Sequence, residues 1–267
     1  MEKKKIIASE KAIKASTAKA AGKKKVVPEK LSATDFIKEL KTLQSPKELE
    51  KIQGYFKSGE GQYAAGDKFI GVRMGQVFAL AKKFTDLSLK EIEKLLESPI
   101  HEVRTGAVSI MDFRARNKKI TPEERKALFD LYIKRHDRIN NWDLIDRSAP
   151  YVVGGYLSDK PRNILYKLAR SKNMWERRTA IVSTFYFIRQ GDVADTFEIA
   201  ELLLKDKEDL VHKAAGGWLR EAGKKDKARL VAFLDKHAAV MPRTMLRYAI
   251  EHFPKKERDQ YLQLKNK

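Results

Sequence analysis

From Ser32 onward, hydrophobic residues recur at the three- and four-residue spacing of one face of an α-helix. The β-friendly run 151–156 contains two glycines and stands alone, and we find no convincing pattern of two strands joined by a turn. The pattern therefore predicts an all-α chain. The helical stripes include Phe36, Leu40 and Leu43, then Leu128, Leu131 and Tyr132, and later Ile199, Leu202 and Leu203.

Start and stop signals divide this pattern into separate helices. A capping residue followed three positions later by a glutamate is typical of a helix N-terminus. Gly191 and Gly223 are plausible stops, because glycine is favoured just after a helix. The predicted starts are Ser88 with Glu91, Thr121 with Glu124, and Asn173 with Glu176.

The predicted helices also repeat in pairs. Residues 102–109 resemble residues 176–183, and weaker copies follow at 145–149, 211–215 and 242–245. Two helices with short loops need this spacing, which predicts a HEAT-like α-solenoid of about six antiparallel helix pairs, curved and with a basic concave face. The basic residues of the copies are Arg104, Arg147, Arg178, Lys213 and Arg243, at intervals of 43, 31, 35 and 30 residues.

Charge gives this row of cations a possible function. The 267-residue chain has 56 Lys and Arg against 36 Asp and Glu, a net charge of +20, which indicates a polyanionic partner. Cations along one groove would neutralise the phosphates of a duplex and position it. Two other interpretations stay open at this point: an acidic membrane surface as the partner, and structural pairing of each cation with an acid of the neighbouring repeat.

The first residues differ from the rest of the chain. Residues 1–30 hold ten Lys, three Glu and no aromatic residue. Such a segment buries too little apolar surface to offset its ordering entropy. We predict a disordered Lys/Ala-rich tail at residues 1–31, either an electrostatic tether or a solubilising tail, and one repeat domain at residues 32–267.

Several classes of site and location find no support. The chain has no cysteine, and its five histidines lack metal-ligand spacing. It has neither an apolar run of the roughly 18 residues that span a bilayer nor a secretory signal. We therefore expect no metal, no cofactor and no membrane association, and a cytoplasmic monomer.

The most suggestive cluster for chemistry is residues 140–147. If a helix begins near Asn141, then Trp142 and Asp146 lie one turn apart on the same face. An indole beside a carboxylate suits a flat, cationic substrate. From spacing alone, a core tryptophan with a capping or salt-bridged aspartate is the favoured interpretation. Trp218 and Tyr55 are likewise open between the core and a groove.

Five segments in series resemble the AlkD-type DNA alkylation repair proteins, a HEAT-like family of DNA glycosylases. The resemblance runs from about residue 33 to residue 262, in order and with compatible spacing. The matching segments are 66–73, 141–146, 174–178, 213–221 and 241–250.

This resemblance implies a solenoid that wraps a duplex and excises positively charged N3- or N7-alkylated purines. By position, Trp142 matches an aromatic residue at the deoxyribose of the lesion, and Asp146 matches the catalytic carboxylate. Arg178 matches a residue that holds the DNA backbone, and Tyr55 matches a groove aromatic. The family places a second groove Trp where this chain has Gly217. Here Trp218 follows one residue later, turned by about 100° on a helix.

The sequence thus predicts a monofunctional alkylpurine DNA glycosylase of the bacterial cytoplasm, associated with the nucleoid when on DNA. Its partner would be duplex DNA with alkylated purines, and no lyase step is expected. Two alternatives are a non-catalytic repeat protein that binds damaged or branched DNA, and a scaffold for an acidic protein partner. The predicted DNA-binding residues are Arg178, Tyr55, Arg104, Arg147, Lys213, Arg243 and Trp218.

Overall fold

The computed structural model describes residues 31–264, which are helical, with one isolated bridge between Lys68 and Ile100 and no named strand among them. The all-α prediction is confirmed. The α-helices are α2 (Ala33–Lys41), α3 (Pro46–Phe56), α4 (Met74–Lys83), α5 (Leu89–Leu96), α6 (His101–Ala115), α7 (Pro122–Lys134), α8 (Trp142–Ala149), α9 (Asn163–Ala169), α10 (Met174–Ser183), α11 (Phe185–Arg189), α12 (Ala194–Leu202), α13 (Asp209–Gly223), α14 (Lys227–His237), α15 (Arg243–Ala249) and α16 (Lys255–Gln263).

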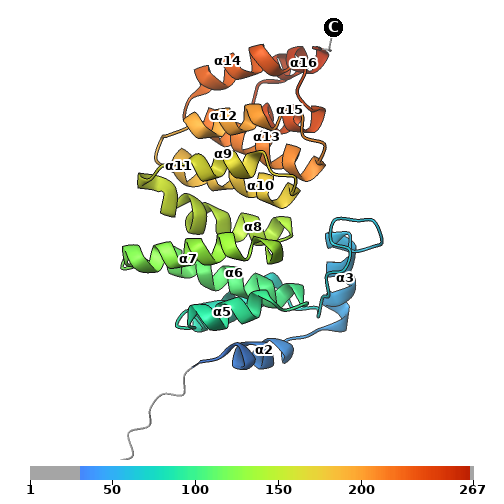
Figure 1. Ribbon diagram of the computed structural model, residues 1–267. Helices are drawn as coiled ribbons and strands as arrows, with labels where there is room; N and C mark the ends of the chain where they lie inside the picture. Colours follow the sequence, from blue (N-terminus) through green and yellow to red (C-terminus); the bar gives the residue numbers. More distant parts are fainter. Residues whose placement is uncertain (1–30, 265–267) are drawn as a thin grey trace, which may run out of the picture. The chain divides into compact units, whose positions relative to one another are not determined.

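Most of these helices stack in successive layers (Figure 1). One continuous row, which we call the inner row, runs α4–α6–α8–α10–α13–α15, each helix packing on the next. Helices α2, α5, α7, α9 and α12 lie against this row or against one another on the outside. The five recurring cations of the sequence all fall on inner-row helices, so the repeat period identified the second helix of each pair. This arrangement confirms the predicted solenoid of helix pairs.

The predicted helix starts hold in detail. The side chains of Ser88 and Thr121 accept the backbone N–H groups of the glutamates three residues later. The Asn173 side chain instead accepts the N–H of Trp175. Each cap satisfies a donor that the first helical turn leaves unpaired, which explains why these polar residues mark boundaries.

The two predicted helix ends, Gly191 and Gly223, and the β-friendly run 151–156 each have a different local structure. Gly191 follows α11 with φ 87°, a left-handed conformation that favours glycine. Gly223 is still the last residue of α13, and it is small because the side chain of Leu230 packs directly on it. The run 151–156 lies in a π-helical turn, Pro150–Gly154, and the start of a short 3-10 turn, Tyr156–Asp159.

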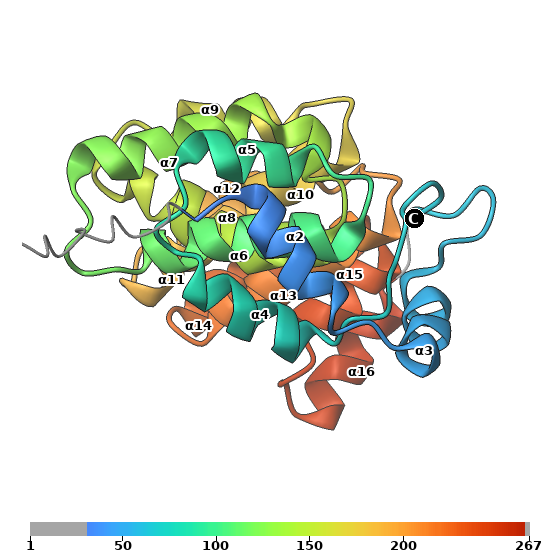
Figure 2. The same ribbon diagram turned by 90° about the horizontal axis from the view of Figure 1, so that it is seen from below.

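The loop of residues 57–73, which we call the arm, stands together with helix α3 beside the stack rather than in it (Figures 1 and 2). The buried Glu102 carboxylate accepts the backbone N–H groups of Ile70, at 3.0 Å, and of Gly71, at 2.9 Å. A small second cluster of Phe56, Ala64 and Phe69 fills the space beneath the arm. The arm is therefore fixed to the stack through its C-terminal half.

The domain begins at a well-defined helix start. Ser32 and Asp35 form a capping box at the N-terminus of α2. The predicted disordered tail, residues 1–31, lies outside the described residues except for Leu31. Among the described residues, no helix is both long and apolar enough to cross a membrane.

Two adjacent glycines of α13 make the inner-row packing testable. A Cβ at Gly216 would come 2.7 Å from the Cβ of Tyr248 on α15, whereas a Cβ at Gly217 would meet no heavy atom within 4 Å. We expect Gly216→Ala to lower the free energy of unfolding by about 1–3 kcal/mol through overpacking. Gly217→Ala should raise it by up to about 1 kcal/mol through helix propensity.

Urea unfolding followed by circular dichroism measures both variants. Equal effects of the two substitutions would contradict the close approach of α13 to α15.

Candidate functional site

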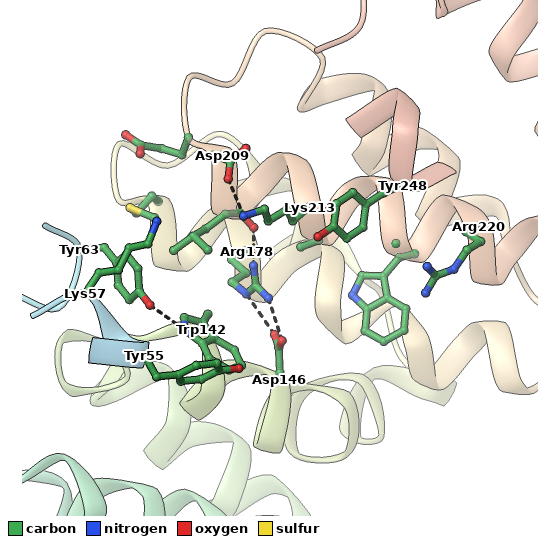
Figure 3. Close-up of a pocket in the computed structure, with 16 residues that line it drawn as sticks. Tyr55, Lys57, Tyr63, Trp142, Asp146, Arg178, Asp209, Lys213, Arg220 and Tyr248 are labelled. Atoms are coloured by element: carbon green, nitrogen blue, oxygen red, sulfur yellow. Dashed lines mark hydrogen bonds and ion pairs between the residues drawn. The ribbon is translucent and has the colours of Figure 1, made fainter. Parts of the chain in front are cut away.

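A cleft of about 650 Å³ lies between the arm and the inner row. It receives side chains from α3 and the arm on one side and from α8, α10, α13 and α15 on the other (Figure 3). Six of the sequence-predicted site residues meet in it. They are Trp142, Asp146, Arg178, Tyr55, Lys213 and Trp218.

Asp146 and Arg178 form the central pair of this cleft. The Arg178 Nε donates to Asp146 Oδ1 at 3.0 Å, and its Nη2 donates to Oδ2 at 2.7 Å, so the pairing is bidentate. The third guanidinium nitrogen, Nη1, donates to the Leu210 carbonyl. Arg178 is buried, at 8% side-chain exposure, while 37% of the Asp146 side chain stays accessible. Each guanidinium nitrogen therefore donates one hydrogen bond within the protein, and the carboxylate remains open to a solute.

The surroundings of Asp146 oppose its ionisation. Burial among the cleft walls raises the pKa of this carboxyl, and the adjacent Arg178 charge only partly offsets that rise. The carboxyl is thus held in a fixed orientation, at a pKa above that of an ordinary aspartate.

The same kind of pair recurs along the inner row. Arg147 on α8 lies 3.2 Å from Asp112 on α6, the same layer-to-layer relation as that of Arg178 on α10 to Asp146 on α8. The hydrogen bonds differ, because both Asp112 oxygens accept the Arg116 Nε–H at 2.8 Å. One layer earlier, Arg104 donates to Asp67 of the arm at 2.5 Å. We call these three pairs the ladder.

The ladder shows how two arginines of the predicted basic stripe are engaged within the protein. Arg104 is only 2% exposed, and its charge is neutralised by Asp67. Arg147 lies over the rings of Phe78 and Phe113 instead of in the cleft. Burying a guanidinium without a partner is costly, so Arg104 pairs with a carboxylate of the arm and Arg147 with one of the preceding inner-row helix.

Arg243 is also outside the cleft. Its Nη1 donates to the Leu264 carbonyl at 3.2 Å and its Nη2 to the Leu262 carbonyl, which ties α15 to the end of the described chain. Pairing with an acid from another element, the kind of structural role that the sequence left open, thus describes Arg104, Arg147 and Arg178, whereas Arg243 pairs with backbone carbonyls.

Trp142 forms the aromatic wall next to Asp146. The Asn141 side chain accepts the Trp142 backbone N–H at 2.8 Å, so α8 begins where the sequence predicted. The indole stacks on Phe56, with ring centroids 5.6 Å apart, and meets Tyr55 edge-on at 5.9 Å. Tyr55 is 66% exposed, which assigns it to the cleft rather than to the core.

Helix α13 supplies the opposite wall. Lys213 pairs with Asp209 at 2.8 Å and keeps 40% of its side chain exposed. Gly217 leaves open space on this wall. The Trp218 ring packs against Phe185 at 4.8 Å, and its buried Nε1 has no hydrogen-bond partner within residues 31–264. The indole one residue later thus lines the cleft without filling the space at Gly217.

Beneath Trp142, His101 is enclosed between two carboxylates. Its Nε2 lies 2.8 Å from Asp143 Oδ2 and its Nδ1 lies 3.4 Å from Asp67 Oδ2. Burial alone lowers the pKa of His101, but the charges and hydrogen bonds of Asp143 and Asp67 outweigh it and raise the pKa to about 9. The imidazolium therefore links the arm to the N-terminus of α8.

Sequence reasoning did not single out several cleft residues. Tyr63 and Lys57 lie in the arm, which has no helical periodicity, so only the docking of the arm brings them to Trp142. Tyr248 and Arg220 are on inner-row helices, and their position relative to the repeated cations was the available signal. Among residues 31–264, no group of three or more His, Cys, Asp or Glu side chains is placed to hold a metal ion.

The fold and the cleft define a helical-repeat protein with an aromatic residue and a fixed carboxylate side by side. The model of the DNA alkylation repair enzyme family matches residues 36–253, so the chain belongs to this family, and its role is in DNA repair.

A solved structure of a predicted DNA alkylation repair enzyme from Enterococcus faecalis has the same fold, with a TM-score of 0.61 and 17% sequence identity. The match covers 79% of this chain and 97% of that one. A search of curated proteins finds no significant match.

The His101 linkage predicts how stability depends on pH. Because the folded-state pKa of about 9 exceeds the ordinary value of 6.5, the stabilisation is complete below pH 6.5 and is lost as pH rises through 9. We expect a loss of roughly 3 kcal/mol over this window.

Urea unfolding at several pH values measures this loss, and His101→Gln should remove the slope. A native profile that stays flat between pH 6.5 and 9 would refute the linkage.

Proposed function

We propose that the protein is a monofunctional DNA glycosylase that excises positively charged N3- or N7-alkylated purines from duplex DNA. The observation that carries this proposal is Asp146, a carboxylate held by a bidentate arginine, open to the cleft and one helical turn from Trp142. We further propose that it acts as a monomer in the bacterial cytoplasm, on the nucleoid, without metal or cofactor.

The chemistry asks little of the enzyme beyond this pair. When the C1′–N bond of an alkylated purine breaks, the base takes the electron pair and leaves as a neutral molecule, so no general acid is required. The sugar becomes an oxocarbenium-like cation, and a fixed carboxylate lowers the barrier to forming it. Water then attacks C1′ and loses a proton, for which Asp146 is the acceptor within reach.

Arg178 acts in this proposal by orienting Asp146 rather than by gripping the DNA backbone. Each of its three guanidinium nitrogens already donates a hydrogen bond, two to Asp146 and one to the Leu210 carbonyl, and the side chain is buried. The DNA phosphates instead contact the two cleft lysines whose side chains remain accessible, Lys57 and Lys213. Each phosphate contact releases a counterion, which makes binding dependent on salt.

A second function, recognition of damaged or branched DNA without excision, is favoured by Gly217. The resemblance places a groove tryptophan at this position, and here that part of the cleft wall is open. A duplex held in the same cleft without this indole would be bound, but its alkylated base would not be excised.

Excision of an alkylated base separates these two functions. Release of 7-methylguanine from methylated duplex DNA should be measured for the native chain and for Asp146→Asn. We expect Asp146→Asn to excise at least about 100-fold more slowly, because the neutral amide cannot stabilise the cationic sugar. DNA affinity should fall little.

The matched control is Asp130→Asn, which alters a carboxylate of α7 paired with Lys126, away from the cleft. No release by the native chain would sink the glycosylase proposal and leave binding alone. Equal release by native and Asp146→Asn proteins would remove Asp146 from the reaction.

The proposed phosphate contact of Lys213 can be tested separately from excision. Lys213→Gln should weaken duplex binding and reduce the slope of log Kd against log salt by about 1. Fluorescence anisotropy with a labelled duplex at several salt concentrations measures both.

Lys236→Gln is the control, since it removes the same charge from α14, where the lysine pairs with Glu201. If both variants bind like the native chain, Lys213 does not contact DNA.

A further inference from the structure

The Trp142 indole is held on three sides, and only one of them is polar. Phe56 stacks on its face and Tyr55 meets it edge-on, so these contacts restrict the plane of the ring. They do little to fix rotation within that plane, because stacking between apolar rings is weakly directional. The indole N–H is the one group of the ring whose direction a hydrogen bond can fix.

Tyr63 of the arm supplies that hydrogen bond. Trp142 Nε1 donates to the Tyr63 hydroxyl oxygen at 3.2 Å (Figure 3). Trp218 in the same cleft offers a contrast, since its buried Nε1 finds no hydrogen-bond partner in the described part of the chain. Of the two cleft tryptophans, the one beside Asp146 is therefore the one with a specific polar anchor.

Tyr63 is itself well anchored. Its ring meets Trp175 of α10 edge-on at 6.3 Å, and the next residue, Ala64, is buried in the small cluster with Phe56 and Phe69. Asp67, four residues after Tyr63, is paired with Arg104 at 2.5 Å. Burial raises the pKa of Tyr63, so the phenol stays neutral. A hydroxyl fixed in this way is a rigid acceptor.

We propose that Tyr63 is a positioning residue that sets the rotation of the Trp142 indole against the bound nucleotide, and so sets where the reacting sugar lies relative to Asp146. The consequence for excision rests on the proposed function. The contact from Tyr63 to Trp142 itself does not. A geometry fixed by one hydrogen bond matters more for the reaction rate than for the affinity of the duplex, because misplacement near the reacting atoms is costly.

The test uses the full chain and the Tyr63→Phe variant, which removes only the hydroxyl. The chain has three tryptophans, so three indole N–H signals are expected in a spectrum of ¹⁵N-labelled protein, and Trp142→Phe assigns one of them. Tyr63→Phe should shift the Trp142 signal and speed its exchange with solvent, with the Trp218 signal unchanged.

Single-turnover excision of 7-methylguanine gives the functional readout. We expect the rate to fall about fivefold, the equivalent of one neutral hydrogen bond, with duplex Kd changed less than about twofold. Tyr261→Phe is the matched control, because it removes a hydroxyl that bonds Asp235 at 2.8 Å outside the cleft.

The outcomes are distinct. An unmoved Trp142 signal in Tyr63→Phe would overturn the inference, and so would equal losses in rate and affinity, which would make Tyr63 a plain DNA contact. If the native chain releases no 7-methylguanine, the glycosylase proposal fails, and the Trp142 signal alone then decides whether Tyr63 positions the indole.

Discussion

The pairing of three inner-row arginines, Arg104, Arg147 and Arg178, with carboxylates of the arm or of the preceding inner-row helix is the interaction on which the rest of the structure depends. A repeat stack buries the ends of long charged side chains between its layers, where an unpaired charge is strongly unfavourable. Asp67 and Asp112 are nearly closed off, at 8% and 0% side-chain exposure, while Asp146 keeps 37%. The candidate reaction centre is thus an ordinary step of the ladder that opens on the cleft.

Helix class, helix starts and the repeat period were all within reach of the sequence, because they depend on local spacing and capping chemistry. The pairing of Trp142 with Asp146 was too, since both lie on one turn of a helix. The direction in which a repeated cation points was not, and Arg104 illustrates why. The acid that neutralises it, Asp67, lies 37 residues away in a non-periodic arm. Tyr63 escaped notice for the same reason.

In the proposed reaction, Asp146 has to meet two demands that normally conflict. A carboxylate that stabilises a developing cation must be ionised and unmoving, yet a solvent-poor cleft disfavours the charge. Arg178 reconciles them by holding both carboxylate oxygens from one side and leaving the other side to the cleft. The aromatic wall of Trp142 and Tyr55 then offers a flat cation a surface that does not compete for the carboxylate.

The fixing of the arm at its C-terminal half has a consequence for how such a cleft diversifies. Glu102 and the His101 link secure the base of the arm, while a Cβ added at Gly59 or Gly61 near its tip would meet no atom of the stack within 4 Å among the described residues. Insertions or substitutions at the tip can therefore reshape one wall of the cleft while the stack keeps its stability. Substrate range and scaffold integrity are in this way separable traits, open to selection or engineering one at a time.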